Sequence, residues 1–295
     1  MMPALRPPSL PNSPARDNPL LTAHLALYGG FLLAAFTWAY WPIIHSLVVT
    51  WSENEDYSHG FFIIPIVIYL IWQKKELLSV NTDNFNVLAA FAVIACSVLY
   101  LAGLFSQFRT MGNLAFVCTI WASLAFVFGF RFVRNHAWEL FLLLFMLPIP
   151  SRWYASITLP LQLLVTKISF FVLQFMNIPV LREGNILQLS NTTLEVVNAC
   201  SGLRSILTII VLAYILSCLL FRAPLKRIVL ISAAIPCAIL ANLIRVSVIA
   251  YLAHQGNTTF IEGTNHTILG LVLFILSLLL LTGCGKVILW LFPEK

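Results

Sequence analysis

Residues 266–290, HTILGLVLFILSLLLLTGCGKVILW, decide the fold, because Lys286 is the only charged side chain in this stretch of 25 residues. A helix of about 20 apolar residues is long enough to cross the roughly 30 Å hydrocarbon core of a bilayer. The rest of the 295-residue chain has the same character, with 60% apolar and 9% charged residues. Soluble domains carry about 25% charged residues. The composition therefore predicts a membrane protein and excludes an ordinary soluble enzyme, a disulfide scaffold and a disordered protein.

Apolar runs of suitable length recur along the chain, and we expect each to form a helix because lipid offers no partner to backbone polar groups. Residues 1–23 contain six prolines and no apolar core of a signal peptide, which predicts an uncleaved, flexible cytoplasmic tail. A single integral membrane domain is expected to follow over 24–295. Its eight predicted spans are 24–50, 59–73, 86–106, 112–130, 136–150, 201–221, 228–253 and 266–290.

The basic residues predict the orientation, because Lys and Arg accumulate in cytoplasmic loops. With both termini inside, eleven basic residues fall in inner segments, whereas only Arg109, Arg152 and Arg182 fall in outer ones. The first outer loop carries acidic residues instead. Lys167, Arg204 and Arg245 remain in or beside apolar runs.

The outer segment 151–199 is the least regular part of the chain. Its apolar portion, 156–178, is predicted to be an interfacial or re-entrant helix that Pro160 breaks and Pro179 ends. Residues 185–197 alternate around a polar turn at 190–193, which predicts a small β-hairpin after Gly184. The expected fold is thus an all-α polytopic membrane protein of about eight spans, with this helix and hairpin ahead of Cys200.

Cys200 is the one cysteine of six that lies outside the interior of a predicted span. It stands where the outer segment enters the 201–221 helix, and the positive end of a helix dipole favours a thiolate. Arg204 follows four residues later, on the same helical face, and adds a cation. The alternative is a buried structural cysteine.

Arg245 lies eight residues from the outer end of its predicted span, about 12 Å deep. A guanidinium at such depth costs at least about 2.5–3.5 kcal/mol, so it should face the bundle interior and a polar partner. Asn242 shares its face. The alternatives are a structural buried pair or a side chain that extends to the outer interface.

His266 begins the last span, again on the outer side, where a histidine is alternatively a simple cap. Cys200, Arg245 and His266 come from three consecutive spans and fall in the outer third of the membrane. A thiol nucleophile needs a proton-transfer partner and a group that stabilises an oxyanion, and histidine and arginine supply these. The three residues are therefore a sufficient set for acyl transfer on a peptide carbonyl.

Four segments of the chain resemble one family of membrane enzymes, the exosortase/archaeosortase family. They are Tyr57-Ser58-His59-Gly60, Asn198-Ala199-Cys200-Ser201-Gly202-Leu203-Arg204-Ser205, Ala241-Asn242-Leu243-Ile244-Arg245, and His266 followed by Gly270. Many members have an acidic residue at the position of Asn198.

The resemblance implies a membrane-embedded cysteine protease or transpeptidase. Such enzymes cleave C-terminal sorting signals, which consist of a short motif such as Pro-Glu-Pro, a transmembrane helix and a basic tail. The resemblance implies that Cys200 is the nucleophile, that Arg245 assists it, and that His266 places the chain in the bacterial, EpsH-like branch. Supporting roles fall to Arg204, Asn242, Ser201, Asn198 and His59.

The same resemblance implies a bacterial inner-membrane location, with the active site facing the exterior and no metal or cofactor. The implied partners are membrane-anchored substrate proteins, membrane lipids and a glycan or lipid acceptor, but no nucleic acid. A rival hypothesis is a transporter or channel in which Arg204 and Arg245 bind an anionic substrate. That hypothesis predicts that Cys200→Ala keeps function and Arg245→Ala loses it. A non-catalytic membrane scaffold is a third hypothesis.

Overall fold

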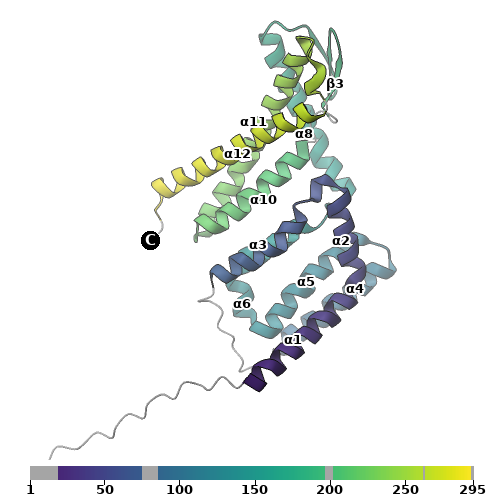
Figure 1. Ribbon diagram of the computed structural model, residues 1–295, viewed down its shortest axis with the longest axis vertical. Helices are drawn as coiled ribbons and strands as arrows, with labels where there is room; N and C mark the ends of the chain where they lie inside the picture. Colours follow the sequence, from purple (N-terminus) through teal and green to yellow (C-terminus); the bar gives the residue numbers. More distant parts are fainter. Residues whose placement is uncertain (1–18, 75–85, 197–201, 262, 294–295) are drawn as a thin grey trace, which may run out of the picture. The chain divides into compact units, whose positions relative to one another are not determined.

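The computed structural model describes residues 19–74, 86–196, 202–261 and 263–293, and these are mostly helical (Figure 1). The contacts divide the chain into two compact units, Met1–His45 and Ser46–Lys295.

Helix α1 (Pro19–Ala39) makes up most of the described part of the first unit. It begins before the predicted limit of the tail at residue 23. Within the predicted 24–50 span the helix is interrupted, because α1 ends at Ala39 and α2 (Trp41–Glu53) follows at a bend of 71°. Pro42 lies directly after the break and has no N–H to continue the hydrogen-bond ladder.

The second unit contains helices that pack as sequential neighbours. The α4–α5 hairpin is one group, and α10, α11 and α12 form another, with α8 packed against α11 (Figure 1). The elements are η1 (Glu55–Tyr57), α3 (Gly60–Gln73), α4 (Val87–Phe105), α5 (Arg109–Phe128), α6 (Phe130–Asn135), α7 (Ala137–Phe141), η3 (Leu142–Met146), α8 (Ser151–Phe175), α10 (Gly202–Leu220), α11 (Pro224–His254), η4 (Thr258–Phe260) and α12 (Thr264–Leu291).

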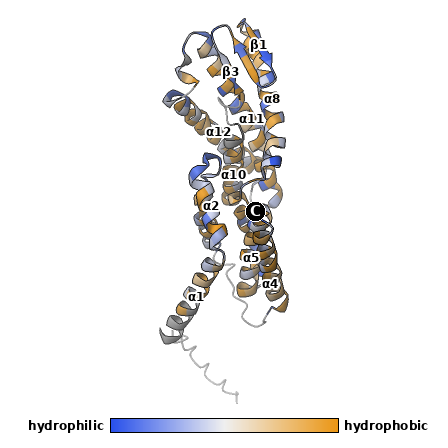
Figure 2. Ribbon diagram, turned by 90° about the vertical axis from the view of Figure 1, so that its right-hand side faces the viewer, coloured by the Kyte–Doolittle hydropathy of each residue, from blue (hydrophilic) through white to orange (hydrophobic). Residues whose placement is uncertain are grey.

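The number of spans differs from the predicted eight. Among the described residues, five helices are long and apolar enough to cross a membrane, or six if α1 and α2 form one bent span. The described apolar parts of the predicted spans 136–150 and 201–221 are shorter, at Ala137–Met146 and Ile206–Leu220. The chain is thus a multi-pass membrane protein. Apolar side chains such as Phe91 on α4 and Leu279 on α12 are exposed, and apolar residues dominate the helices in Figure 2.

Residues 151–175 correct the prediction for the outer segment. The expected helix broken at Pro160 is instead continuous from Ser151 to Phe175, with Pro160 inside it, and it ends before Pro179. Its length and composition would allow it to cross a membrane. Its buried face is partly polar, with Gln162, Thr166 and Ser169. Prolines are tolerated in membrane helices when neighbouring groups satisfy the freed backbone.

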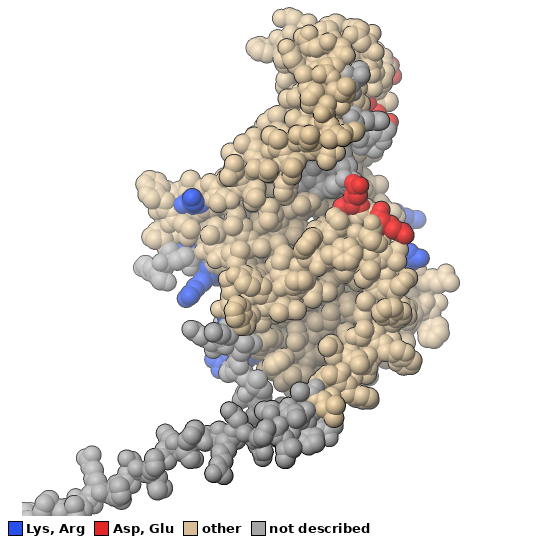
Figure 3. All heavy atoms as spheres, in the orientation of Figure 1, with Lys and Arg blue, Asp and Glu red and all other residues tan. Residues whose placement is uncertain are grey.

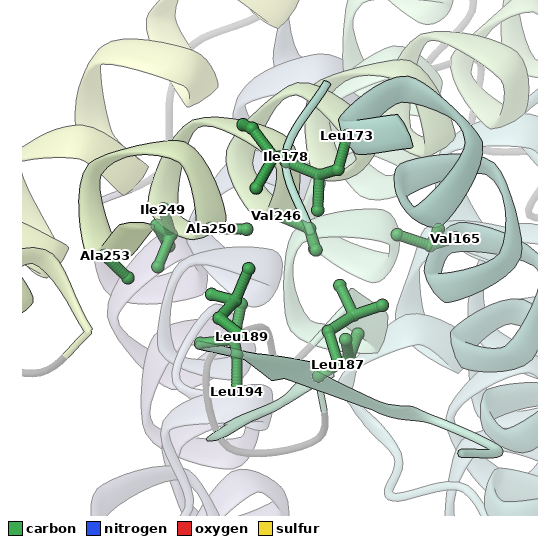
Figure 4. Close-up of a cluster of buried hydrophobic side chains, with 11 residues drawn as sticks. Val165, Leu173, Ile178, Leu187, Leu189, Leu194, Val246, Ile249, Ala250 and Ala253 are labelled. Carbon is green, nitrogen blue, oxygen red and sulfur yellow. The ribbon is translucent and has the colours of Figure 1, made fainter. Parts of the chain in front are cut away.

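The predicted hairpin is confirmed and belongs to a three-stranded antiparallel sheet of order β1-β2-β3. Strands β2 (Ile186–Leu189) and β3 (Thr193–Glu195) flank the expected polar turn. The additional strand β1 (Val180–Glu183) pairs with β2 across a turn at Gly184, whose φ of +61° suits glycine. Leu187, Leu189 and Leu194 pack on side chains of α8 and α11 (Figure 4). This contact anchors the sheet to the helices.

Candidate active site

Arg245 and His266 meet through the antiparallel packing of α11 and α12. Arg245 lies in the second half of α11, and His266 lies in the first turn of α12. Arg245 Nη2 is 2.5 Å from His266 Nε2, and both side chains are partly buried. The structure therefore gives the deep arginine the polar partner that the cost of its burial requires.

A second contact determines which nitrogen of His266 carries the hydrogen. His266 Nδ1 lies 3.0 Å from the carbonyl oxygen of Phe260 in η4. A carbonyl oxygen only accepts, so Nδ1 donates, and Nε2 presents its lone pair to the guanidinium. The 258–260 turn therefore fixes both the tautomer and the direction of the ring.

Gly270 makes room for the guanidinium one turn further along α12. A Cβ atom at Gly270 would lie 3.2 Å from Arg245 Nη2 and 3.3 Å from Cζ. Those separations are tighter than ordinary van der Waals contact. The absence of a side chain at Gly270 thus allows Arg245 to lie against the helix backbone.

A cavity of about 20 Å³ lies beside Arg245, between α10, α11 and α12. Ile209, Asn242 and Ser277 border it together with Arg245. Asn242 Oδ1 and Arg245 Nε are buried and have no hydrogen-bond partner among the described residues. Such unpaired polar atoms are costly in isolation, and they provide an acceptor and a donor beside the Arg245–His266 pair.

The structure describes only some of the remaining predicted site residues. Cys200, Asn198 and Ser201 lie outside the described residues. Arg204 lies in the first turn of α10, but the structure describes only its backbone and not its side chain. The described part of α10 borders the Arg245 cavity through Ile209, so the helix that follows Cys200 runs beside the Arg245–His266 pair.

His59 lies in a different pocket, of about 290 Å³, which Tyr57, Phe145 and Leu207 of α10 also border. His59 Nε2 is 3.1 Å from the carbonyl oxygen of Phe145 and donates to it. The backbone N–H of Ile149 donates to the Tyr57 hydroxyl at 3.1 Å. The structure thus brings Asn242, Arg245 and His266 together and gives His59 separate contacts.

A family model described as Transmembrane exosortase (Exosortase_EpsH) matches residues 51–283. The chain belongs to the transmembrane exosortase family, in its EpsH-like branch. No curated protein and no solved structure matches the chain. Membership supports a general role as a membrane peptidase or transpeptidase, and the matched range includes Cys200, Arg245 and His266.

The chain also contains a buried ionic cluster that the sequence analysis did not predict. Glu139, 1% exposed, accepts from Lys74 Nζ at 2.5 Å and lies 3.7 Å from Nη1 of the buried Arg227. Arg227 also donates from Nε to the Phe221 carbonyl at 2.8 Å. The available signal was that Glu139 is the only acidic residue within the eight predicted spans. Lys74 and Arg227 are therefore partners of a buried carboxylate as well as orientation signals.

Proposed function

We propose that this exosortase-family chain cleaves C-terminal sorting signals of membrane-anchored proteins through a thioester on Cys200. The Arg245–His266 contact carries the proposal, because it pairs a proton carrier with an oxyanion-stabilising cation beside α10. The signal consists of a short motif, a transmembrane helix and a basic tail, as the family resemblance implies. We place the site at the outer face of a bacterial inner membrane, with both chain termini in the cytoplasm.

The Cys200 thiol transfers its proton to Nε2 of His266, and the thiolate attacks the peptide carbonyl carbon. Arg204, four residues after Cys200, adds positive charge near the thiolate. The new carbon–sulfur bond moves an electron pair to the carbonyl oxygen, which Arg245 stabilises. Protonated His266 can no longer accept from Arg245, so the guanidinium N–H is released toward the oxyanion.

Collapse of this intermediate breaks the carbon–nitrogen bond, and His266 returns the proton to the leaving amine. The remaining thioester is resolved by a second nucleophile, which is water, a glycan or a lipid amine. Asn242 Oδ1, which is buried and unpartnered among the described residues, accepts from a backbone N–H of the bound peptide. Asn198 and Ser201 flank the nucleophile and support its position.

The direct test uses co-expression of the chain with a reporter protein that ends in Pro-Glu-Pro, an apolar helix and a basic tail. Wild type should convert the reporter to a shorter product, and Cys200→Ala should stop the conversion while the enzyme remains in the membrane. Cys237→Ala changes a partly buried thiol in α11 and serves as the matched control. Unchanged conversion by Cys200→Ala would contradict the proposal.

The transporter hypothesis gains less support from the same region. The cavity beside Arg245 has a volume of only about 20 Å³, little more than one water molecule needs. An anionic substrate would need a continuous path beside Arg245. Transport that survives Cys200→Ala and disappears in Arg245→Ala would favour that hypothesis over peptide cleavage.

A further inference from the structure

A third pocket, of about 930 Å³, lies where α2, the beginning of α5 and the beginning of α8 meet. Arg109 and Arg152 both border it, although they are 43 residues apart in the sequence. These are two of the three basic residues in the predicted outer segments. Neither guanidinium forms an ion pair or hydrogen bond within the part of the chain that the structure describes, and no acidic residue borders the pocket there. The pocket therefore carries positive charge that no described acidic residue balances.

Two helix N-termini add to this charge. Helix α5 begins at Arg109 and α8 begins at Ser151, and neither has a side-chain hydrogen bond at its cap. The first N–H groups of a helix have no intrahelical acceptor, and the helix dipole places partial positive charge there. Phosphate groups bind at such helix ends. The 20-residue and 25-residue helices thus both begin at one pocket, although the Arg109 N–H already donates to the Gln107 carbonyl.

Asn113 provides an independent indication of a ligand. Its side chain is 7% exposed, borders the pocket, and has no hydrogen bond to any described residue. The buried Thr119 on the same helix, by contrast, donates to the Ala115 carbonyl at 2.8 Å. The Asn113 amide atoms are not among the fully enclosed, unpaired polar atoms of the structure, so they keep access to the pocket that the residue borders. An oxygen-rich ligand in the pocket could accept from the Asn113 amide.

The residues at the rim of the pocket indicate which kind of anionic ligand it binds. Trp153 is 70% exposed and Phe108 is 59% exposed, and both border the pocket. Aromatic side chains gather where membrane helices meet the lipid headgroups. Guanidinium groups form paired, charge-assisted hydrogen bonds to phosphate. We propose that this pocket binds the phosphate headgroup of a membrane lipid, with the acyl chains against Trp153 and Phe108.

The proposed lipid site is independent of the cleavage reaction, since it uses none of the residues assigned to catalysis. Segment 144–149 separates it from the pocket that contains His59, because Leu144, Leu147 and Ile149 border both. A bound lipid would therefore contact the same segment that His59 and Tyr57 hold. Failure of lipid binding would leave the Cys200 proposal untouched.

The test is native mass spectrometry of the full-length protein in detergent that contains phosphatidylglycerol. Wild type should retain phosphatidylglycerol, and the Arg109→Gln, Arg152→Gln double variant should bind it at least about tenfold more weakly. Asn113→Leu should also weaken binding. Arg182→Gln is the matched control, because Arg182 is the third outer arginine and lies on β1, where it donates to the Gly184 carbonyl.

Two ligand controls on the wild-type protein separate the possible sources of the anion. Diacylglycerol with the same acyl chains should not be retained, because it lacks the phosphate. Inorganic phosphate should displace phosphatidylglycerol only at large excess, and equal affinity for the two would overturn the assignment to a lipid. Equal lipid retention by wild type and the double variant would overturn the site, as would an equal loss in Arg182→Gln.

Discussion

At the residue scale, the geometry around Arg245 follows from a few contacts that the sequence only partly predicts. The sequence predicts a polar partner for Arg245, and His266 at the start of the next span is that partner. The roles of Phe260 and Gly270 could not be predicted. The first depends on a backbone carbonyl in the 258–260 turn, and the second on a side chain that is absent.

The close approach of Gly270 to Arg245 leads to a prediction. Gly270→Val should push the guanidinium from His266 and reduce reporter cleavage by about 10²-fold or more, the usual cost of losing one oxyanion-stabilising donor. The measurement is the initial rate of reporter conversion at matched enzyme levels in the membrane. Gly283→Val is the control, because a Cβ at that position on α12 meets nothing within 4 Å. Equal rates for the two variants would disprove the steric role of Gly270.

At the element scale, the main difference from prediction is the segment from Ala137 to Pro150. Hydropathy alone predicts a span there, but the chain forms two short helices and an extended end. Trp51 Nε1 donates to the Met146 carbonyl at 2.9 Å, His59 donates to the Phe145 carbonyl, and the Ile149 N–H donates to the Tyr57 hydroxyl. Irregular backbone within a membrane protein persists only where such partners satisfy it. These partners lie 86 to 95 residues away in sequence, so the local pattern could not predict them.

The Trp51 bond can be tested by removing its donor. Trp51→Phe leaves the Met146 carbonyl unpaired and should lower the free energy of unfolding by about 1–3 kcal/mol. The loss should appear as a lower midpoint in the thermal unfolding of the protein in detergent. Trp290→Phe changes an indole that is 81% exposed and should leave the midpoint close to that of wild type. A midpoint unchanged in Trp51→Phe would show that the bond does not hold this segment.

The Lys74–Glu139–Arg227 cluster connects α3, α7 and α11, and its removal should be costly. Glu139→Ala leaves Arg227 buried without an opposite charge, which typically costs about 3–5 kcal/mol. We expect a large fall in folded protein, measured as the monodisperse fraction in size-exclusion chromatography. Glu53→Ala changes an exposed acid and is the control. Similar yields for the two variants would show that the buried carboxylate is dispensable.

At the scale of the whole molecule, composition and charge predict a multi-pass membrane protein, and the helices confirm it. In the view of Figure 3, the visible acidic side chains lie on the right, and basic side chains are visible on both sides. The number of spans was not predictable from hydropathy, because Pro160 is compatible with a continuous α8 and Pro42 accompanies a bend in 24–50. The general role was predictable, because the segment around Cys200 is specific to the family whose model matches residues 51–283.

The proposed orientation leads to a prediction for the complete chain. A fluorescent protein fused after Lys295 should fluoresce, because such proteins fold in the cytoplasm, and alkaline phosphatase at the same position should be inactive. When the chain is truncated in the acidic loop near Glu55 and fused there, the fluorescent protein should be dark and alkaline phosphatase should be active. Active phosphatase at the C-terminus would reverse the orientation and place the Cys200 end of α10 inside the cell.

The most direct measurement of the central claim is mass spectrometry of the covalent intermediate. Cells that express the enzyme and the sorting-signal reporter are denatured quickly in acid, and the enzyme is digested and analysed. We predict that the reporter fragment is attached to the peptide that contains Cys200, and that hydroxylamine at neutral pH releases it. The adduct should be present in Cys237→Ala and absent in Cys200→Ala. Reporter cleavage without a Cys200 adduct, or an adduct on another residue, would contradict the account.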